Sequence, residues 1–174
     1  EEKYPAQDSF TITKEWYKKE LGVVSFSKKA SSLNKKQKFS EEYVRARFIY
    51  SLIYSGKYNK ENICVEAQFP KGNGGKSINP DIVIFKNPDW NLVINSMDDF
   101  AKLKEKILVV FEAKKDDNAD ISTIIQKQLL SALNEYQHPE NSEEKNIVYG
   151  VYFDNNPDIL IFKKESTYQT KRYY

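Results

Sequence analysis

The feature that most constrains the fold is the run at residues 107–113 (ILVVFEA), in which five consecutive apolar residues precede Glu112. A run that is nearly continuous in apolar residues is typical of a central strand buried on both faces of a sheet. The chain has 174 residues, which suits one domain with a sizeable core and is short for two. We therefore expect one domain and one functional site.

Periodic segments on both sides of this run predict the other elements. Helices are expected where apolar residues recur with helical spacing behind a capping residue, and strands where apolar and β-branched residues alternate between turn residues. The expected helices cover residues 40–55 (N-cap Ser40), a short segment near 97–104, and 120–136 (N-cap Asp120), and the expected strands cover 62–69, 78–85, 107–113, 147–153 and 159–163. The main order is helix, three strands, helix, two strands. It predicts an α/β fold in which helices pack on a mixed sheet.

Residues 1–39 differ from the rest and are predicted to be a basic extension or linker attached to a domain at residues 40–174. They hold nine lysines against five acids, a possible short helix at 14–21 and a stretch rich in Ser, Lys and Asn at 25–38. A solvated surface is the plainer interpretation of these lysines. Contact with the phosphates of a nucleic acid is the alternative.

Composition excludes several classes of protein. Hydrophobic residues make up 40% of the chain and charged residues 30%, and no apolar run is long enough to cross a bilayer, so we expect a soluble protein without a membrane role. The first residues lack the features of a secretion signal, which makes the cytoplasm the expected location. The single cysteine, Cys64, and the single histidine, His138, exclude a disulfide framework and sites rich in cysteine or histidine. Any catalysis must therefore rest on carboxylates and lysine.

Three charged residues stand inside or beside apolar strands. Asp81 follows Pro80 and precedes Ile-Val-Ile, while Glu112 and Lys114 close the most hydrophobic strand. An ionised group at the margin of a core costs several kcal/mol unless it is paired or binds a metal. Because side chains alternate along a strand, Glu112 and Lys114 point to the same face and can share a site. A purely structural pair between Glu112 and Lys114 is the alternative interpretation.

Two acids and a lysine in one cleft are what metal-assisted hydrolysis of a phosphodiester requires. Carboxylate oxygens suit Mg²⁺, which takes one or two protein carboxylates together with waters and substrate phosphate. The ion would polarise the phosphoryl group and lower the pKa of a bound water. An ammonium group beside it can orient that water and stabilise the charge of the transition state.

The string Pro80-Asp81, then about thirty residues, then Glu112-Ala113-Lys114 on a hydrophobic strand resembles the PD-(D/E)XK nuclease superfamily. The flanking elements are similar too. The segment Glu41-Glu42-Tyr43-Val44-Arg45 resembles the opening helix of the nuclease domain in type I restriction enzyme R subunits, and the closing hairpin resembles the end of that domain. The resemblance covers residues 40–164 and implies a restriction-endonuclease-like core of helix, three strands, helix and strand.

The resemblance also implies roles for individual residues. Asp81 and Glu112 would hold Mg²⁺ together with the backbone carbonyl of Ala113, and Lys114 would serve the attacking water. An acid of the opening helix, Glu41 with Glu42 as the reserve choice, would join the metal shell. The helix after the E-x-K strand would add Gln128, which helical periodicity places on the inward face, with Tyr136 two turns further on. Mn²⁺ would substitute for Mg²⁺.

The implied activity is an endonuclease domain that cuts double-stranded DNA within a larger restriction enzyme. Helicase or translocase, methyltransferase and specificity functions would come from further domains or subunits. Two alternatives stay open. One is a catalytically degenerate module of the same fold that binds nucleic acid or a partner protein, and the other is a structural interaction domain that docks through its basic first segment.

Overall fold

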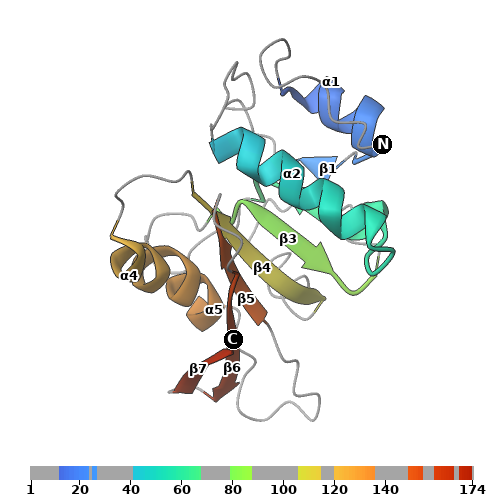
Figure 1. The fold of residues 1–174 in the computed structure, drawn as a ribbon. Helices are drawn as coiled ribbons and strands as arrows, with labels where there is room; N and C mark the ends of the chain where they lie inside the picture. Colours follow the sequence, from blue (N-terminus) through green and yellow to red (C-terminus); the bar gives the residue numbers. More distant parts are fainter. Residues whose placement is uncertain are drawn as a thin grey trace.

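The computed structural model describes the backbone of residues 12–23, 25–26, 41–67, 79–87, 106–114, 120–135, 149–154, 159–166 and 169–173. These segments form a mixed β-sheet with helices packed on it, an α/β architecture (Figure 1). The predicted helix near residues 97–104, the predicted cap Ser40, His138 and Tyr136 lie outside the described residues.

The described strands form one seven-stranded sheet whose spatial order follows the chain. The strands are β1 (Ser25–Phe26), β2 (Ile63–Val65), β3 (Ile82–Phe85), β4 (Ile107–Ala113), β5 (Tyr149–Phe153), β6 (Leu160–Ser166) and β7 (Gln169–Tyr173). The strands β2, β3 and β4 form an antiparallel meander, β5 lies parallel to β4, and β5, β6 and β7 are again antiparallel. At the other edge, β1 lies parallel to β2.

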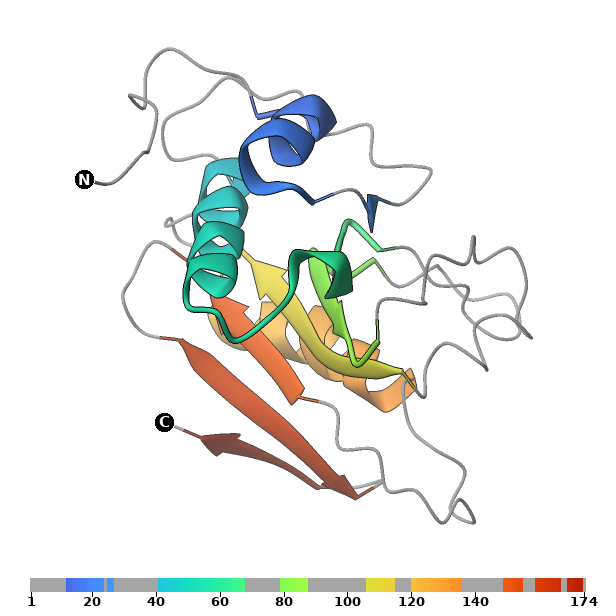
Figure 2. The ribbon, with the colours of Figure 1, turned by 90° about the vertical axis from the view of Figure 1, so that its right-hand side faces the viewer.

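Two helical layers cover opposite faces of this sheet (Figure 2). On one face lies α2 (Glu41–Tyr54), which begins and ends as the sequence predicts to within one residue. On the other face lies a continuous helical segment that links β4 to its parallel neighbour β5 and consists of α4 (Ile121–Ile124), η4 (Ile125–Leu130) and α5 (Ser131–Glu135). Asp120 caps this segment as predicted, because its side chain accepts a hydrogen bond from the backbone N–H of Thr123.

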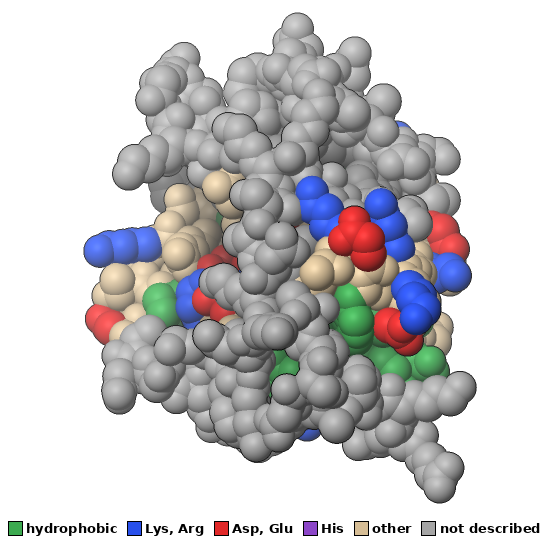
Figure 3. All heavy atoms as spheres, turned by 90° about the horizontal axis from the view of Figure 1, so that it is seen from above, with side chains coloured by type: hydrophobic (Ala, Val, Ile, Leu, Met, Phe, Trp, Pro, Cys, Tyr) green, Lys and Arg blue, Asp and Glu red, His purple; other side chains and the backbone are tan. Residues whose placement is uncertain are grey.

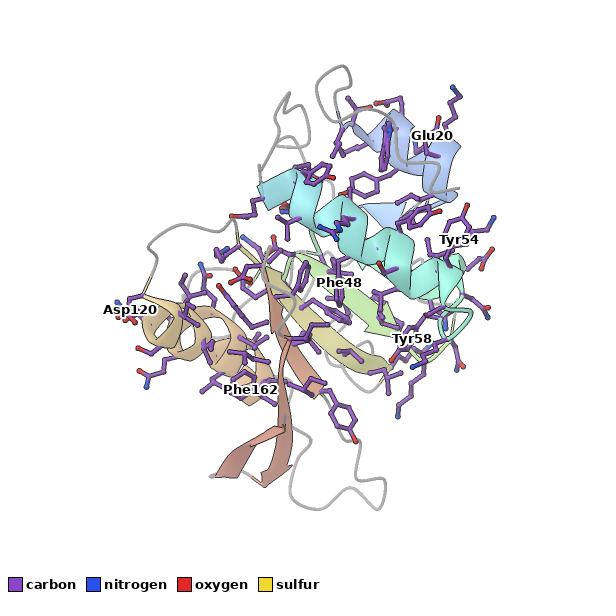
Figure 4. The ribbon with its side chains drawn as sticks, viewed as in Figure 1. Glu20, Phe48, Tyr54, Tyr58, Asp120 and Phe162 are labelled. Carbon is purple, nitrogen blue, oxygen red and sulfur yellow. The ribbon has the colours of Figure 1, made fainter. Side chains whose placement is uncertain are left out.

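The core under α2 is built from alternate residues of the central strands. Phe48 of α2 reaches down onto the sheet (Figure 4), where its ring stacks on that of Phe153 at 3.9 Å and lies 5.4 Å from that of Phe111. The other face of β4 holds Ile107 and Val110, which pack with residues of the second helical layer. The central strand is therefore covered on both faces, which is the arrangement that the run at residues 107–113 predicts.

The described part of residues 1–39 is packed into the same core. It contains α1 (Lys14–Trp16) and η1 (Tyr17–Leu21), which agree with the predicted short helix, and the side chains of Tyr17 and Leu21 are buried in the core under α2. Burial of several apolar side chains contributes a few kcal/mol to folding. This part of the predicted extension is therefore integral to the core.

Gly150 on β5 allows close contact between the sheet and the second helical layer. A methyl group at this position would lie 2.8 Å from Cδ1 of Leu133 and 3.1 Å from Cγ of Leu129. We expect Gly150→Ala to lower the free energy of unfolding by about 1–3 kcal/mol, because overpacking forces side chains or backbone to shift. Urea unfolding followed by circular dichroism measures the change. An unchanged midpoint and slope would show that the helical layer moves aside without cost.

Candidate active site

The predicted site residues meet where three elements begin or end. Asp81 immediately precedes β3, Glu112 and Lys114 lie at the end of β4, and Glu41 is the first residue of α2. Figure 1 shows the start of β3, the end of β4 and the start of α2 on the same side of the molecule. Antiparallel pairing of β3 with β4 brings this about, since it places the start of one strand beside the end of the other.

The lysine lies between two of the acids. Nζ of Lys114 donates a hydrogen bond to Oε1 of Glu112 at 2.7 Å and lies 3.6 Å from Oε2 of Glu41. Glu112 is buried, while Lys114 and Glu41 are partly exposed. The alternation along β4 therefore places Glu112 and Lys114 on one face, as predicted. The cluster is reachable from solvent through Lys114 and Glu41.

Asp81 is fixed in place by its backbone as well as its side chain. Its N–H donates to the carbonyl of Phe111 at 3.1 Å, and its own carbonyl accepts from the N–H of Glu66 at 2.8 Å. Its carboxylate Oδ2 accepts a hydrogen bond of 2.7 Å from the backbone N–H of Ala113. The fold therefore binds Asp81 directly to the segment that carries Glu112 and Lys114.

A buried arginine, Arg45 of α2, lies at the centre of the acids. Its Nη2 donates to Oδ1 of Asp81 at 2.8 Å, and its Nη1 donates to Oε1 of Glu66 at 2.5 Å. Glu42 and Glu41 lie 3.3 Å and 3.8 Å away. Neither the strand pattern nor the resemblance assigned Arg45 or Glu66 a role. The available signal was that the helical periodicity of residues 40–55 places Arg45 within the apolar face, where a charge needs partners.

The two acids at the start of α2 have different surroundings. Glu42 is buried, accepts a hydrogen bond of 2.5 Å from the hydroxyl of Tyr17 and pairs with Arg45. Burial raises the pKa of Glu42 and raises that of Tyr17 well above its usual range. Glu41, in contrast, contacts Lys114. Of the two candidates for the helix acid, Glu41 is the one that reaches the lysine of the site.

The cluster carries an excess of negative charge. In the ion pairs of the described residues, five acids pair with only two cations, Arg45 and Lys114. The formal excess is three negative charges when all five acids are ionised. The acids are Glu41, Glu42, Glu66, Asp81 and Glu112. Burial, reinforced by the charge of Asp81, raises the pKa of Glu112 to about 8. Burial lowers the pKa of Lys114, but the charges of Glu112 and Asp81 outweigh this and raise it overall. Lys114 is therefore an ammonium ion at neutral pH.

The raised pKa of Glu112 predicts how the stability of the metal-free protein depends on pH. The folded state holds a proton on Glu112 up to about pH 8, whereas the unfolded state releases it near pH 4.5. The contribution of this group is therefore greatest below pH 4.5 and is lost as the pH rises to 8, by up to about 1.4 kcal/mol per pH unit. In EDTA, we expect the free energy of unfolding to fall less steeply from pH 5 to 8 in Glu112→Gln than in the wild type. If the free energies of unfolding of the two proteins fell in parallel from pH 5 to 8, the raised pKa of Glu112 would be contradicted.

Gln128 does not occupy the place predicted for it. Helical periodicity puts it near the middle of the inward stripe, but its side chain is exposed, and this orientation was predicted wrongly. The reason is local geometry, because Gln128 lies in the π-helical segment η4, whose wider turns change which positions face inward. Its neighbour Leu129 is buried. The structure therefore gives no support for a role of Gln128 in the cluster, and Tyr136 lies outside the described residues.

The carboxylates fit a hard divalent cation in kind and in charge. A carboxylate offers about four acceptor positions. Asp81 uses two of them, one on each oxygen, for Arg45 and Ala113. Within the described segments, however, no three acidic, histidine or cysteine side chains are grouped as a ready metal cage. Binding an ion would therefore require the acids paired with Lys114 to move toward Asp81, whose own carboxylate is held by Arg45 and Ala113.

The described surface on one face of the molecule has mixed charge. Figure 3 shows lysine and arginine side chains interspersed with aspartate and glutamate on the face seen from above the view of Figure 1.

None of the helices within the described segments is long and apolar enough to span a bilayer. Comparisons of the chain with protein-family models, with curated proteins and with solved structures return no significant match.

Proposed function

We propose that this chain contains the Mg²⁺-dependent endonuclease domain of a restriction enzyme, similar to that of type I R subunits, and that it hydrolyses phosphodiester bonds of double-stranded DNA. The convergence of Asp81, Glu112 and Lys114, with Glu41 beside the lysine, is the observation that carries this proposal. An acidic cluster with a formal excess of negative charge, fixed at the ends of adjacent strands, is suited to hold a cation against a phosphate.

The order of the elements supports the same proposal. The chain runs from α2 through the meander of β2, β3 and β4 into the helical segment from α4 to α5 and back to β5, parallel to β4. This is the helix, three-strand, helix, strand order that the resemblance to PD-(D/E)XK nucleases implies. In that order, the aspartate directly precedes β3 and the E-x-K residues lie at the end of the neighbouring strand, β4.

The proposed chemistry assigns one task to each group. Asp81 and Glu112, together with the carbonyl of Ala113, would hold the ion, and Glu41 would join them directly or through a water. When bound, the ion supplies a polarised phosphoryl group and a water of lowered pKa. The ammonium of Lys114 orients the attacking water and stabilises the negative charge that develops on the phosphate oxygens.

Several parts of the activity would come from outside this domain. A nuclease domain contacts mainly the DNA backbone, and such contacts carry no sequence information. We therefore infer that target recognition and translocation come from partner domains or subunits, and that the enzyme works in the cytoplasm, where incoming DNA is met. Lysines near the site would provide the phosphate contacts.

Titration with Mn²⁺ tests the proposal most directly. We expect calorimetry to show saturable uptake by the wild-type protein and none by Asp81→Ala, because this change removes a carboxylate from the proposed ion shell. Asp120→Ala is the matched control, since it removes an exposed carboxylate that caps α4 (Figure 4) and should bind Mn²⁺ normally. Supercoiled plasmid incubated with Mg²⁺ should be cut by the wild type and by the control only.

One observation favours a second candidate, a degenerate module of the same fold that binds nucleic acid or a protein. Both carboxylate oxygens of Asp81 already accept hydrogen bonds within the protein. If this state is permanent, the acids serve only to bind Arg45 and Lys114. A flat Mn²⁺ titration of the intact protein would favour this candidate over the nuclease.

A further inference from the structure

Arg45 pairs with four acids of the cluster and Lys114 with two, yet the proposed chemistry gives Arg45 no task. It bridges two acids from different parts of the chain, binding Asp81 through Nη2 at 2.8 Å and Glu66 through Nη1 at 2.5 Å. Its side chain is only 3% exposed. Burying a charge to this degree has a high desolvation cost. A role as an ordinary solvated surface residue therefore does not explain Arg45.

The contacts of Arg45 fix the orientation of the Asp81 carboxylate. Oδ1 binds the guanidinium and Oδ2 binds the backbone N–H of Ala113, so both oxygens are held at once. Each oxygen keeps a second acceptor position, and the direction of that position is set by the two hydrogen bonds. Glu66 holds the other half of the planar guanidinium fork, which restricts its rotation.

We propose that Arg45, anchored by Glu66, is a positioning residue that orients the Asp81 carboxylate for a divalent cation at this site. The inference rests on the proposed function, and it deepens that function by naming the support of its metal shell. Residues that hold a metal ligand by hydrogen bonds set its direction and its basicity, and their loss typically weakens metal binding by about 10–100-fold.

A charge-matched substitution separates positioning from simple charge balance. Removing the charge of Arg45 would strengthen metal binding by electrostatics and weaken it by disorder, so the two effects would oppose each other. Arg45→Lys keeps the charge but replaces the two-pronged fork by a single ammonium. We expect this variant to bind Mn²⁺ about tenfold or more weakly in calorimetry, while Arg47→Lys, an exposed change on the same helix, binds with wild-type affinity.

Glu66→Asp provides a second test that disturbs the core less. Glu66 is partly exposed, and its φ of 55° is a conformation that aspartate tolerates. The shorter side chain keeps its charge but withdraws from Nη1, so Mn²⁺ affinity should fall in the same direction as in Arg45→Lys. If Arg45→Lys does not fold, as judged by near-UV circular dichroism, Glu66→Asp decides the question.

The outcomes distinguish this inference from the proposed function. Wild-type Mn²⁺ affinity in a folded Arg45→Lys or Glu66→Asp protein would overturn the positioning role and leave the nuclease proposal standing. Absence of Mn²⁺ binding in the wild type would overturn both. Weaker binding in both variants, with normal binding in Arg47→Lys, is the result that supports the inference.

Discussion

Lys114→Ala is expected to lower the rate of metal-dependent DNA cleavage by at least about 10²–10³-fold, which is the usual loss when one stabilising donor is removed from a transition state. The Lys114 ammonium lies 2.7 Å from Oε1 of Glu112, at the end of β4. Burial lowers the pKa of Lys114, but the charges of Glu112 and Asp81 outweigh this effect and keep it protonated. It is thus a fixed positive charge at the point where the proposal places the phosphate. Alanine offers neither the charge nor a donor.

The fold should survive this substitution. Lys114 is partly exposed and lies just beyond the strand, and Glu112, whose pKa is raised to about 8, can stay protonated and uncharged at neutral pH without its partner. Initial rates on supercoiled plasmid, with near-UV circular dichroism as the check on folding, measure the effect. Lys127→Ala removes an exposed lysine of η4 and should cut at the wild-type rate. A folded Lys114→Ala protein that still cuts would exclude the proposed role.

The central part of the fold follows from local patterns in the sequence. The apolar run of β4 predicts a strand covered on both faces, and the charges at its end predict a site, because a charge there needs a partner. Antiparallel pairing with β3 then brings Asp81 beside Ala113. The strand prediction is confirmed because it depends on residues close together in the chain. The contact of Asp81 with Ala113 joins residues that are 32 positions apart, and the functional site stays a prediction.

Other parts depend on contacts that local patterns do not contain. The two-residue strand β1 lies in a stretch predicted to be a linker and is held by pairing with β2, and the polar strand β7 is held by pairing with β6. Neither has an alternation of its own to reveal it. Arg45 was visible as a charge on an apolar face, but its partner Glu66 comes from 21 residues further along the chain. Gln128 was misplaced because the pattern assumes an α-helix where the structure has a π-helix.

The largest loss of stability is expected from Phe153→Ala, about 3–5 kcal/mol, the usual range for removing a buried phenylalanine. Phe153 is 2% exposed, and its ring stacks on Phe48 at 3.9 Å and meets Phe111 edge-on at 6.4 Å. Alanine would leave a cavity between α2 and the sheet. Neither layer can move in to fill it, because the helix is held by its internal hydrogen bonds and the sheet by the pairing of its strands. Urea unfolding measures the loss, and an unchanged slope of the free energy of unfolding against urea concentration checks that unfolding stays two-state.

Tyr54→Ala is the matched control for the aromatic contact. The ring of Tyr54 stacks on that of Tyr50 at 4.0 Å, much as Phe153 stacks on Phe48, but Tyr54 is 64% exposed (Figure 4). Tyr54→Ala should lower the free energy of unfolding by less than about 1 kcal/mol, because folding removes little of the Tyr54 ring from water. Equal losses in the two variants would show that ring stacking, and not burial, stabilises this layer.

Phe153 also connects the core to the site. Its backbone carbonyl accepts the N–H of Lys114 at 3.1 Å, and it lies opposite Ala113 in the pairing of β4 with β5. A cavity here loosens the end of β4, which carries Glu112 and Lys114. Phe153→Leu, which fills most of the space, should restore both stability and Mn²⁺ binding. If Phe153→Ala bound Mn²⁺ as tightly as the wild type well below its melting temperature, the ends of β4 and α2 would be held without this ring, and the core would not be what positions the acids.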